Sequence, residues 1–138
     1  MCNIAGVAGD LVTLDQQDRN VWKRVYDVNV MGAVYTTKHL CLHMQQRKSG
    51  AIVNIASIAG IRSGAGGNAY SASKAALINF TQTAACDLGG YHIRVNAVCP
   101  GPTRGPLWEG PGGLGDQLGH VLGMSGPEAV KWFAEQNI

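Results

Sequence analysis

The alternation of apolar and polar positions along the chain predicts strands and helices in turn. Apolar residues recur at helical spacing from about Asp18 to Arg47 and again from Ala69 to Leu88. The run Ala51–Ala56 is short, β-branched and nearly all apolar, which is typical of a strand buried on both faces of a parallel sheet. Ile93–Val98 is a second such strand, and Met1–Gly6 has the pattern of a strand end followed by a turn.

Segments rich in glycine separate these elements. Residues 57–68 have the composition of a Gly/Ser loop, and residues 101–126, which combine glycine with proline, are predicted to be a loop or lid. Pro127, in a permitted first-turn position, favours a short final helix. Strands that alternate with helices indicate βαβ units with right-handed crossovers. We therefore predict a single α/β domain over residues 1–138.

Composition and charge narrow the class of protein. The chain has 138 residues, of which 46% are apolar, so it can bury a core and is expected to be ordered. The net charge is +2 and the basic residues are scattered, which is not the footprint of a nucleic-acid-binding protein. No apolar run approaches the roughly 18 residues of a spanning helix, and no secretory signal is visible. We expect neither nucleic acid nor membrane among its partners.

The four cysteines indicate a reducing compartment. Cys2, Cys41, Cys86 and Cys99 form no C-x-x-C pair, which favours free thiols. We therefore expect a cytoplasmic protein.

The predicted topology locates a binding site. In open parallel sheets, ligands bind beyond the carboxyl ends of the strands. In this chain those ends are Asn3–Gly6, Ser57 onward and Cys99–Thr103, all of which are rich in small or hydroxyl residues. The site should lie where the three segments converge.

The second predicted helix carries the most informative chemistry. Tyr70 and Lys74 are four residues apart in its first turns and therefore share a face. A free tyrosine has a pKa near 10 and is a poor base at neutral pH, but an adjacent ammonium stabilises the phenolate. Lowering the pKa by about three units requires about 4 kcal/mol, so a further positive charge, such as an oxidised nicotinamide, would help. Ser57 can add a hydrogen bond to a substrate oxygen.

Together with other segments, this pair resembles a known family. Tyr70-x-x-x-Lys74, with Ser57 thirteen residues upstream, is similar to the motif of the short-chain dehydrogenase/reductases. Three further segments agree with that family in order and spacing: Asn3-Ile4-Ala5-Gly6, Asn29 within the long helix, and Pro100-Gly101 after the last strand. The resemblance implies a Rossmann-like, doubly wound parallel sheet with helices on both faces. It also implies an NAD(P)-dependent oxidoreductase that interconverts a ketone and a secondary alcohol.

The resemblance implies a role for each catalytic residue. Tyr70 would be the general acid/base, and Lys74 would lower the pKa of Tyr70 and bind the nicotinamide ribose. Ser57 would orient the reacting oxygen. Asn29 would support a helix kink and hold a water that links Lys74 to solvent.

The cofactor, NAD or NADP, is likewise implied by the resemblance. Asn3, Ala5 and Gly6 would line the adenosine-ribose side through their backbone, while Tyr70 and Lys74 would meet the nicotinamide ribose. Pro100, Gly101 and Thr103 would approach the nicotinamide, and no metal is implied. A small carbonyl or alcohol substrate and a homo-oligomer, formed through the two long helices, complete the expected partners.

The sequence departs from the family pattern in two respects. Gly105 stands where family members often carry a threonine, and Thr103 is the nearest hydroxyl. The glycine-rich phosphate turn T-G-x-x-x-G-x-G does not occur in these 138 residues, nor do the first strands and the last strand of the family. The sequence is thus expected to correspond to an incomplete, middle-to-late part of a subunit. A non-catalytic homologue that acts as a partner-binding or assembly module is the alternative.

Three other motifs suggest different functions. Ser71-Ala72-Ser73-Lys74 fits the S-x-x-K nucleophile motif, but its companion motifs are absent. His39 and His43 have the spacing of a metal-binding helix, but Leu40 replaces the general base. The hexapeptide Gly110–Gly115, GPGGLG, fits G-x-G-x-x-G but follows no strand directly, so we interpret it as part of a substrate lid.

Overall fold

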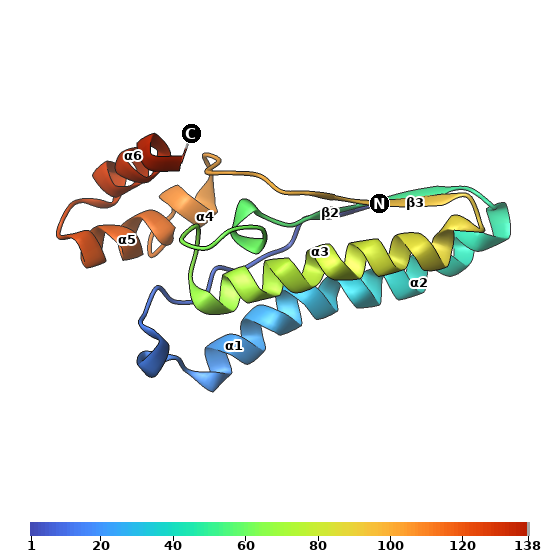
Figure 1. The fold of residues 1–138 in the computed structure, drawn as a ribbon, viewed down its shortest axis with the longest axis horizontal. Coiled ribbons are helices and arrows are strands. Elements are labelled where there is room, and N and C mark those ends of the chain that lie inside the picture. Colours follow the sequence, from blue (N-terminus) through green and yellow to red (C-terminus); the bar gives the residue numbers. More distant parts are fainter. Residues whose placement is uncertain (138) are drawn as a thin grey trace.

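The computed structural model describes residues 1–137, which form a short parallel sheet, three long helical segments beside it and a cluster of short helices at one end (Figure 1). The strands are β1 (Cys2–Asn3), β2 (Gly50–Ile55) and β3 (Ile93–Val98). The helices are α1 (Arg19–Tyr26), α2 (Gly32–Arg47), α3 (Asn68–Gly89), α4 (Pro106–Glu109), α5 (Leu114–Leu122) and α6 (Gly126–Asn137). The shorter segments are η1 (Leu14–Gln16), η2 (Asp27–Met31) and η3 (Ile58–Gly60).

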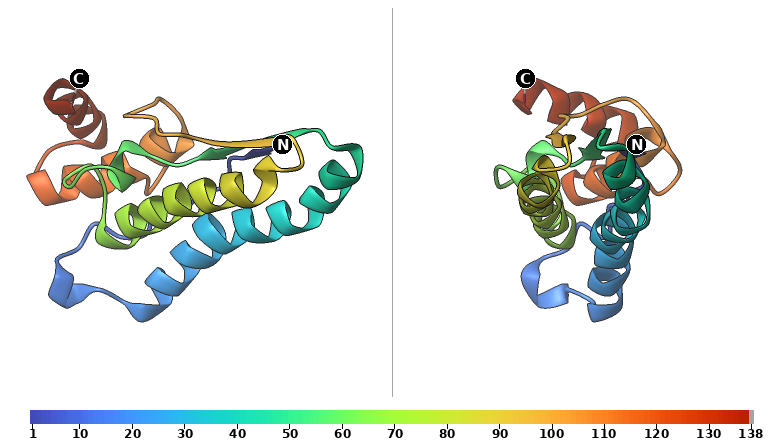
Figure 2. Two further views of the ribbon diagram at one scale, coloured as in Figure 1. Left: turned by 45° about the vertical axis from the view of Figure 1, so that its right-hand side comes forward. Right: turned by 90° about the vertical axis from the view of Figure 1, so that its right-hand side faces the viewer.

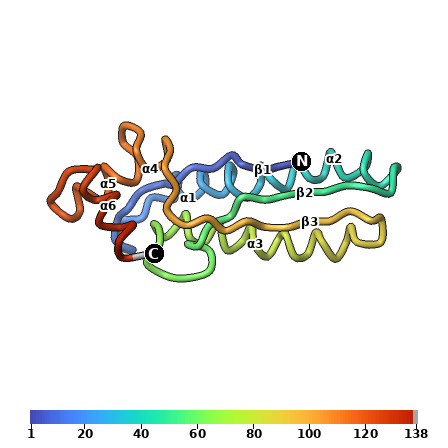
Figure 3. The backbone as a smooth tube through the Cα atoms, turned by 90° about the horizontal axis from the view of Figure 1, so that it is seen from above, coloured from blue at the N-terminus to red at the C-terminus, as the bar shows by residue number. Residues whose placement is uncertain are grey.

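The strands lie in the order β1-β2-β3 and all run parallel, as the alternating pattern predicts. Val53 pairs with Cys2 on one side and with Asn96 on the other. Within residues 1–137, helices α1, α2 and α3 lie on the same face of the sheet, and no helix lies over the opposite face (Figures 1 and 3). The parallel α/β fold is confirmed, and this part of the chain supplies one of its two helical layers.

Strand residues that face the helices are buried, because the helices cover only one face of the sheet. Ile52, Ile93 and Val95 point toward the helices and are buried against Met44 and Leu88. The alternate β2 residues 51, 53 and 55 are only half-buried. The expectation that Ala51–Ala56 is buried on both faces is therefore wrong for the described residues, because the helices cover only one face.

The first predicted helix is continuous over the expected range but contains an irregular turn. α1, η2 and α2 follow one another without a break from Arg19 to Arg47 (Figure 1). Asp18 caps the start, with its side chain accepting a hydrogen bond from the backbone N–H of Asn20. η2 is a π-helical turn centred on Asn29, and such turns occur frequently at functional sites.

The segment predicted as a loop, residues 101–126, contains helices α4 and α5, so this prediction is wrong in part. Pro106 begins α4 at a position where its missing N–H costs nothing. α5 packs tightly on α6 because Gly115 and Gly119 have no side chain; a Cβ on Gly119 would lie 2.7 Å from the carbonyl oxygen of Met124. Figure 2 shows these helices, coloured orange to red, at one end of the molecule.

Candidate active site

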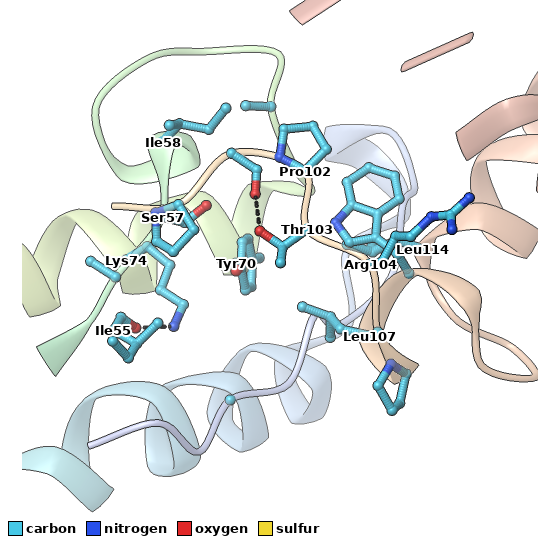
Figure 4. Close-up of a pocket in the computed structure, with 18 of the residues that line it drawn as sticks. Ile55, Ser57, Ile58, Tyr70, Lys74, Pro102, Thr103, Arg104, Leu107 and Leu114 are labelled. Carbon is cyan, nitrogen blue, oxygen red and sulfur yellow. Dashed lines mark hydrogen bonds between the residues drawn. The ribbon is translucent and has the colours of Figure 1, made fainter. Parts of the chain in front are cut away.

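A pocket of about 320 Å³ lies at the carboxyl ends of the strands, beneath the segment that leads into α4 (Figure 4). Its floor comes from the end of β2 and the start of α3, and its outer wall from residues 100–108. The residues that line it are Ile4, Gly6, Ile55, Ala56, Ser57, Ile58, Ala65, Tyr70, Lys74, Pro100 to Trp108, Leu114 and Phe133. The predicted site at the convergence of the three strand ends therefore coincides with a cavity large enough for a small ligand.

Tyr70 lies in the first turn of α3 and is 8% exposed. Burial raises the pKa of Tyr70 above its ordinary value, while a hydrogen bond with Ser57 lowers it. Ser57 is held in place by its own turn, since its Oγ accepts a hydrogen bond of 3.1 Å from the backbone N–H of Ala59. Because burial is the larger effect, the phenol is protonated at neutral pH.

Lys74 lies one helical turn after Tyr70 and is 3% exposed. Its Nζ donates a hydrogen bond of 2.8 Å to the backbone carbonyl of Ile55 and lies 5.5 Å from the centroid of the Tyr70 ring. Burial lowers the pKa of Lys74, and the neighbouring Cys99 side chain acts in the opposite direction. The pocket thus holds the buried Lys74 amine beside the Tyr70 phenol.

Asn29 lies directly behind this pair and is 1% exposed. Its Oδ1 accepts a hydrogen bond of 2.8 Å from the N–H of Val7, and its Nδ2 donates one of 3.0 Å to the carbonyl of the same residue. Nδ2 also donates to Ser73 Oγ at 2.9 Å, and Ser73 Oγ donates to the carbonyl of Tyr70 at 2.7 Å. Asn29 therefore connects the π-helical turn both to the strand end of β1 and to the first turn of α3.

Ser73 is a residue that the sequence reasoning missed. It is fully buried and stands three residues after Tyr70, in Tyr70-x-x-Ser73-Lys74. The signal available in the sequence was this spacing, because residues three and four apart share a helix face.

Gly60 is a second missed residue, and it sets the distance between the Ser57 turn and α3. A Cβ on Gly60 would lie 2.7 Å from the backbone nitrogen of Ala75 and 2.9 Å from the carbonyl oxygen of Lys74. Only glycine allows η3 to approach the helix so closely. Ser57 thereby comes within hydrogen-bonding distance of Tyr70.

The predicted cofactor residues near β1 divide into two groups. Gly6 lines the pocket, and a Cβ added there would lie 3.4 Å from Lys74 Nζ. Asn3 does not line the pocket; its side chain donates to Asn54 Oδ1 at 2.8 Å and accepts from Thr36 Oγ1 at 2.7 Å. Ala5 is exposed beside the pocket without lining it.

The predicted residues after β3 all line the pocket. Pro100, Gly101 and Thr103 form its outer wall, and Thr103 Oγ1 donates a hydrogen bond of 3.1 Å to the carbonyl of Gly101 (Figure 4). With Gly6, Tyr70 and Lys74 opposite, these residues offer hydroxyl, ammonium and backbone groups across a mainly apolar cavity. This donor set fits the ribose and carboxamide of a nicotinamide nucleotide.

The structure gives no support to the competing motifs. Ser71 does not line the pocket, and its hydroxyl donates to the carbonyl of Gly66 at 3.3 Å. His39 and His43 are exposed on α2, and residues 1–137 contain no group of three side chains suited to a metal ion. In the part of the chain described, no helix has the length and apolar character needed to cross a membrane.

The hexapeptide GPGGLG is a turn between α4 and α5. Gly113 caps α5, so the segment does open a helix, but the N–H of Gly112 donates to Asp116 Oδ2 at 2.9 Å and that of Gly113 donates to the carbonyl of Gly110 at 2.8 Å. These two backbone N–H groups are already hydrogen-bonded within the turn, and the acidic Asp116 would repel a phosphate. The turn also follows α4 rather than a strand.

A family model described as "short chain dehydrogenase" matches residues 1–110. The chain belongs to the short chain dehydrogenase family. This membership confirms the resemblance drawn from Tyr70, Lys74, Ser57 and the two strand-end motifs.

Several short chain dehydrogenase relatives align with most of the chain. The cis-4-hydroxycyclohexanecarboxylate dehydrogenase of Sinomonas cyclohexanicum is 41% identical over 106 residues, which cover 77% of this chain and 43% of the relative. Momilactone A synthase of Oryza sativa subsp. japonica is 37% identical over 137 residues, which cover 95% of this chain and 50% of the relative.

Solved structures of the family are also similar to this chain. The crystal structure of an NAD⁺-bound xylitol dehydrogenase is 39% identical, has a TM-score of 0.74, and covers 78% of this chain and 42% of its own. The chain thus spans about two fifths to one half of the length of these short chain dehydrogenase relatives.

Proposed function

We propose that this chain forms part of an NAD(P)-dependent oxidoreductase that interconverts a ketone and a secondary alcohol. The observation that carries the proposal is the meeting of Ser57, Tyr70 and Lys74 in one pocket at the carboxyl ends of the strands. Family membership supports the reaction class. Bound NAD or NADP would supply or accept the hydride at its nicotinamide ring.

The side chains have distinct roles in this proposal. In the reducing direction Tyr70 donates its phenolic proton to the carbonyl oxygen of the substrate, and in the oxidising direction it accepts the alcohol proton. Ser57 holds the same oxygen by a hydrogen bond. Lys74 stabilises the phenolate that forms and, with Gly6 and Thr103, holds the nicotinamide ribose and carboxamide.

The electrostatics of the site favour Tyr70 as an acid in the free protein. Burial raises the pKa of Tyr70, so its neutral form prevails at neutral pH and a proton is available for ketone reduction. Alcohol oxidation requires the phenolate. The Lys74 ammonium stabilises that form, and the positive charge of an oxidised nicotinamide adds to it.

The substrate is proposed to be a small carbonyl or alcohol compound with an apolar body. Ile58, Leu107, Trp108 and Phe133 supply apolar surface to the pocket. By its printed name, the Sinomonas relative acts on a hydroxylated cyclohexane ring, which is a body of this kind.

A homo-oligomer in the cytoplasm is also proposed. The long helix α2 presents large apolar side chains to its surface, with Tyr35 55% exposed and Leu42 58% exposed. All four cysteines are free, which is compatible with a reducing compartment. Sedimentation of wild type and of Leu42→Glu tests the assembly, and an unchanged sedimentation coefficient in the variant argues against this helix as the contact.

The proposed reaction is tested by Tyr70→Phe in the complete protein. The variant should lower turnover of a secondary alcohol with NAD or NADP by about 10²-fold or more, because the proton donor is lost while the ring remains. Unfolding free energy should change little, and Tyr91→Phe, which alters an exposed tyrosine, serves as the matched control. Near-normal turnover in Tyr70→Phe would contradict the assignment.

A further inference from the structure

The charged side chains of the pocket are both cationic. Of the residues that line it, only Lys74 and Arg104 carry a formal charge, and no aspartate or glutamate is among them. Lys74 already serves the proposed chemistry beside Tyr70. Arg104 has no part in that chemistry, yet it adds a second positive charge to an otherwise apolar and hydroxyl-bearing wall.

The two cations lie at opposite ends of the pocket. Figure 4 shows Lys74 at one side, Arg104 at the other, and Tyr70 and Leu107 between them. Arg104 belongs to the segment between β3 and α4, whereas Lys74 belongs to α3. A ligand that reaches both ends must therefore carry a reacting oxygen at one end and a group that binds a cation at the other.

Arg104 also lies at a junction between two cavities. A second cavity of about 740 Å³ lies among α4, α5 and α6, and it shares Pro102, Thr103, Arg104 and Trp108 with the first. The lining of this second cavity includes the acidic residues Glu109, Asp116 and Glu135 and the basic residue Lys131. An anionic group that reaches the end of the first pocket would be stabilised at Arg104, where the two cavities meet.

The guanidinium group of Arg104 is available for such a group. Its side chain is 94% exposed, and its described ion pair joins Nε to Glu109 Oε1 at 3.6 Å. That long contact between exposed groups is weak. The two terminal nitrogens have no partner among residues 1–137, so they can donate two parallel hydrogen bonds to a carboxylate.

We propose that Arg104 is a specificity-determining residue that binds a carboxylate on the substrate, at the end of the pocket away from Lys74. The preferred substrate class is then a hydroxy or oxo acid with an apolar body between its two polar ends. The inference rests on the proposed function for the role of Tyr70, but the carboxylate contact itself can be measured without turnover. Glu109 competes with the substrate for Arg104.

The test compares two ligands of the same shape that differ in charge. Cyclohexanecarboxylate and cyclohexanecarboxamide are titrated calorimetrically into the complete protein with saturating NADH. Wild type should bind the carboxylate about tenfold more tightly than the amide. Arg104→Gln should abolish this difference, and Glu109→Gln should increase it. Arg47→Gln, which removes the same charge at the far end of α2, should leave it unchanged.

Three results overturn the inference. They are equal affinity of wild type for the two probes, no binding of either probe, and a preference that survives in Arg104→Gln. A loss of NADH affinity in Arg104→Gln with an unchanged carboxylate preference would instead assign the arginine to the cofactor phosphates. Turnover by wild type is measured separately, so a failure of the proposed reaction is distinguishable from a failure of the carboxylate contact.

Discussion

At the scale of single residues, the candidate site depends on a line of buried hydrogen bonds behind Tyr70. Val7, Asn29, Ser73 and the carbonyl of Tyr70 are joined by contacts between 2.7 and 3.0 Å. Since Asn29 lies in the π-helical turn and Ser73 in α3, these contacts fix one helix relative to the other. The orientation of the Tyr70 ring therefore depends on residues that do not touch the pocket.

The Ser73→Ala variant tests this dependence. It removes the acceptor for Asn29 Nδ2 and the donor to the Tyr70 carbonyl, and we expect a loss of about 1–3 kcal/mol in unfolding free energy. We also expect kcat to fall while KM stays nearly constant, because Tyr70 is displaced and not removed. Ser71→Ala is the matched control, since its hydroxyl makes a single 3.3 Å contact two residues earlier. Equal effects of the two variants on kcat would show that Ser73 has no positioning role.

The ionisation of Tyr70 gives a prediction that needs no substrate. Because burial raises the pKa of Tyr70, its phenolate should form only above pH 10.0, the ordinary pKa of tyrosine. The absorbance difference between wild type and Tyr70→Phe measures this titration. The folded protein keeps this proton more tightly than the unfolded chain does. The contribution of Tyr70 to the free energy of unfolding is therefore fully present below pH 10.0, and it is lost as the pH rises through the folded-state pKa of Tyr70.

Ser57→Ala should move the phenolate transition to still higher pH, since the hydrogen bond from Ser57 lowers the pKa of Tyr70. A transition at lower pH in Ser57→Ala would contradict the electrostatic description of the pocket.

At the scale of elements, the spacing of apolar residues predicts helices and strands correctly where one face of the element is buried. The segments around Val25, Leu77 and Val95 have regular apolar spacing, and their helices and strand form where predicted. The pair Tyr70 and Lys74 was predictable for the same reason, since four residues separate them on one helix face. Ser57 was predictable as a third site residue because it follows the end of a predicted strand.

Periodicity failed where close backbone packing decides the structure. The many glycines of residues 101–126 predict a loop, yet Gly115 and Gly119 allow α5 to pack on α6. The π-helical turn at Asn29 has no pattern of its own, because it depends on hydrogen bonds to Val7, twenty-two residues away. Gly60 was missed because its function is to let η3 approach the backbone of α3, which no local pattern records.

The packing of α5 on α6 gives a prediction for the stability of the helices α4, α5 and α6. A Cβ on Gly115 would lie 2.6 Å from Val130 Cγ2 and 2.8 Å from the carbonyl oxygen of Trp108, so Gly115→Ala must separate the helices. We expect a loss of about 1–3 kcal/mol, confined to α4, α5 and α6 and seen as faster hydrogen exchange there. Gly89→Ala, with no atom within 4 Å of the added Cβ, should leave exchange unchanged. Unaltered exchange in Gly115→Ala would show that α4, α5 and α6 do not pack as described.

At the scale of the whole molecule, the site occupies one end and one side of the sheet. Gly6, Ser57 and Pro100 follow the strands at the same edge of the sheet, Tyr70 and Lys74 come from α3 in the helical layer, and residues 100–108 form the outer wall of the pocket. Figures 1 and 2 show α4, α5 and α6 at this end of the molecule. The opposite face of the sheet has no helix over it among residues 1–137. In the proposed function, these groups would hold the nicotinamide half of the cofactor.

The last prediction concerns cofactor affinity, because this chain has residues proposed for the nicotinamide half of the cofactor but lacks the glycine-rich phosphate turn. The 138 residues contain no T-G-x-x-x-G-x-G turn, and the donors at the start of α5 are engaged by Asp116 and Gly110. The chain on its own should therefore bind NADH and NADPH weakly and about equally, with a Kd on the order of 1 mM, about −4 kcal/mol. Calorimetric titration with Lys74→Met as the control should show that the remaining affinity depends on the ammonium. Micromolar binding that survives in this variant would mean that other residues of the chain hold the phosphates, with the helix start at Gly113 the first to examine.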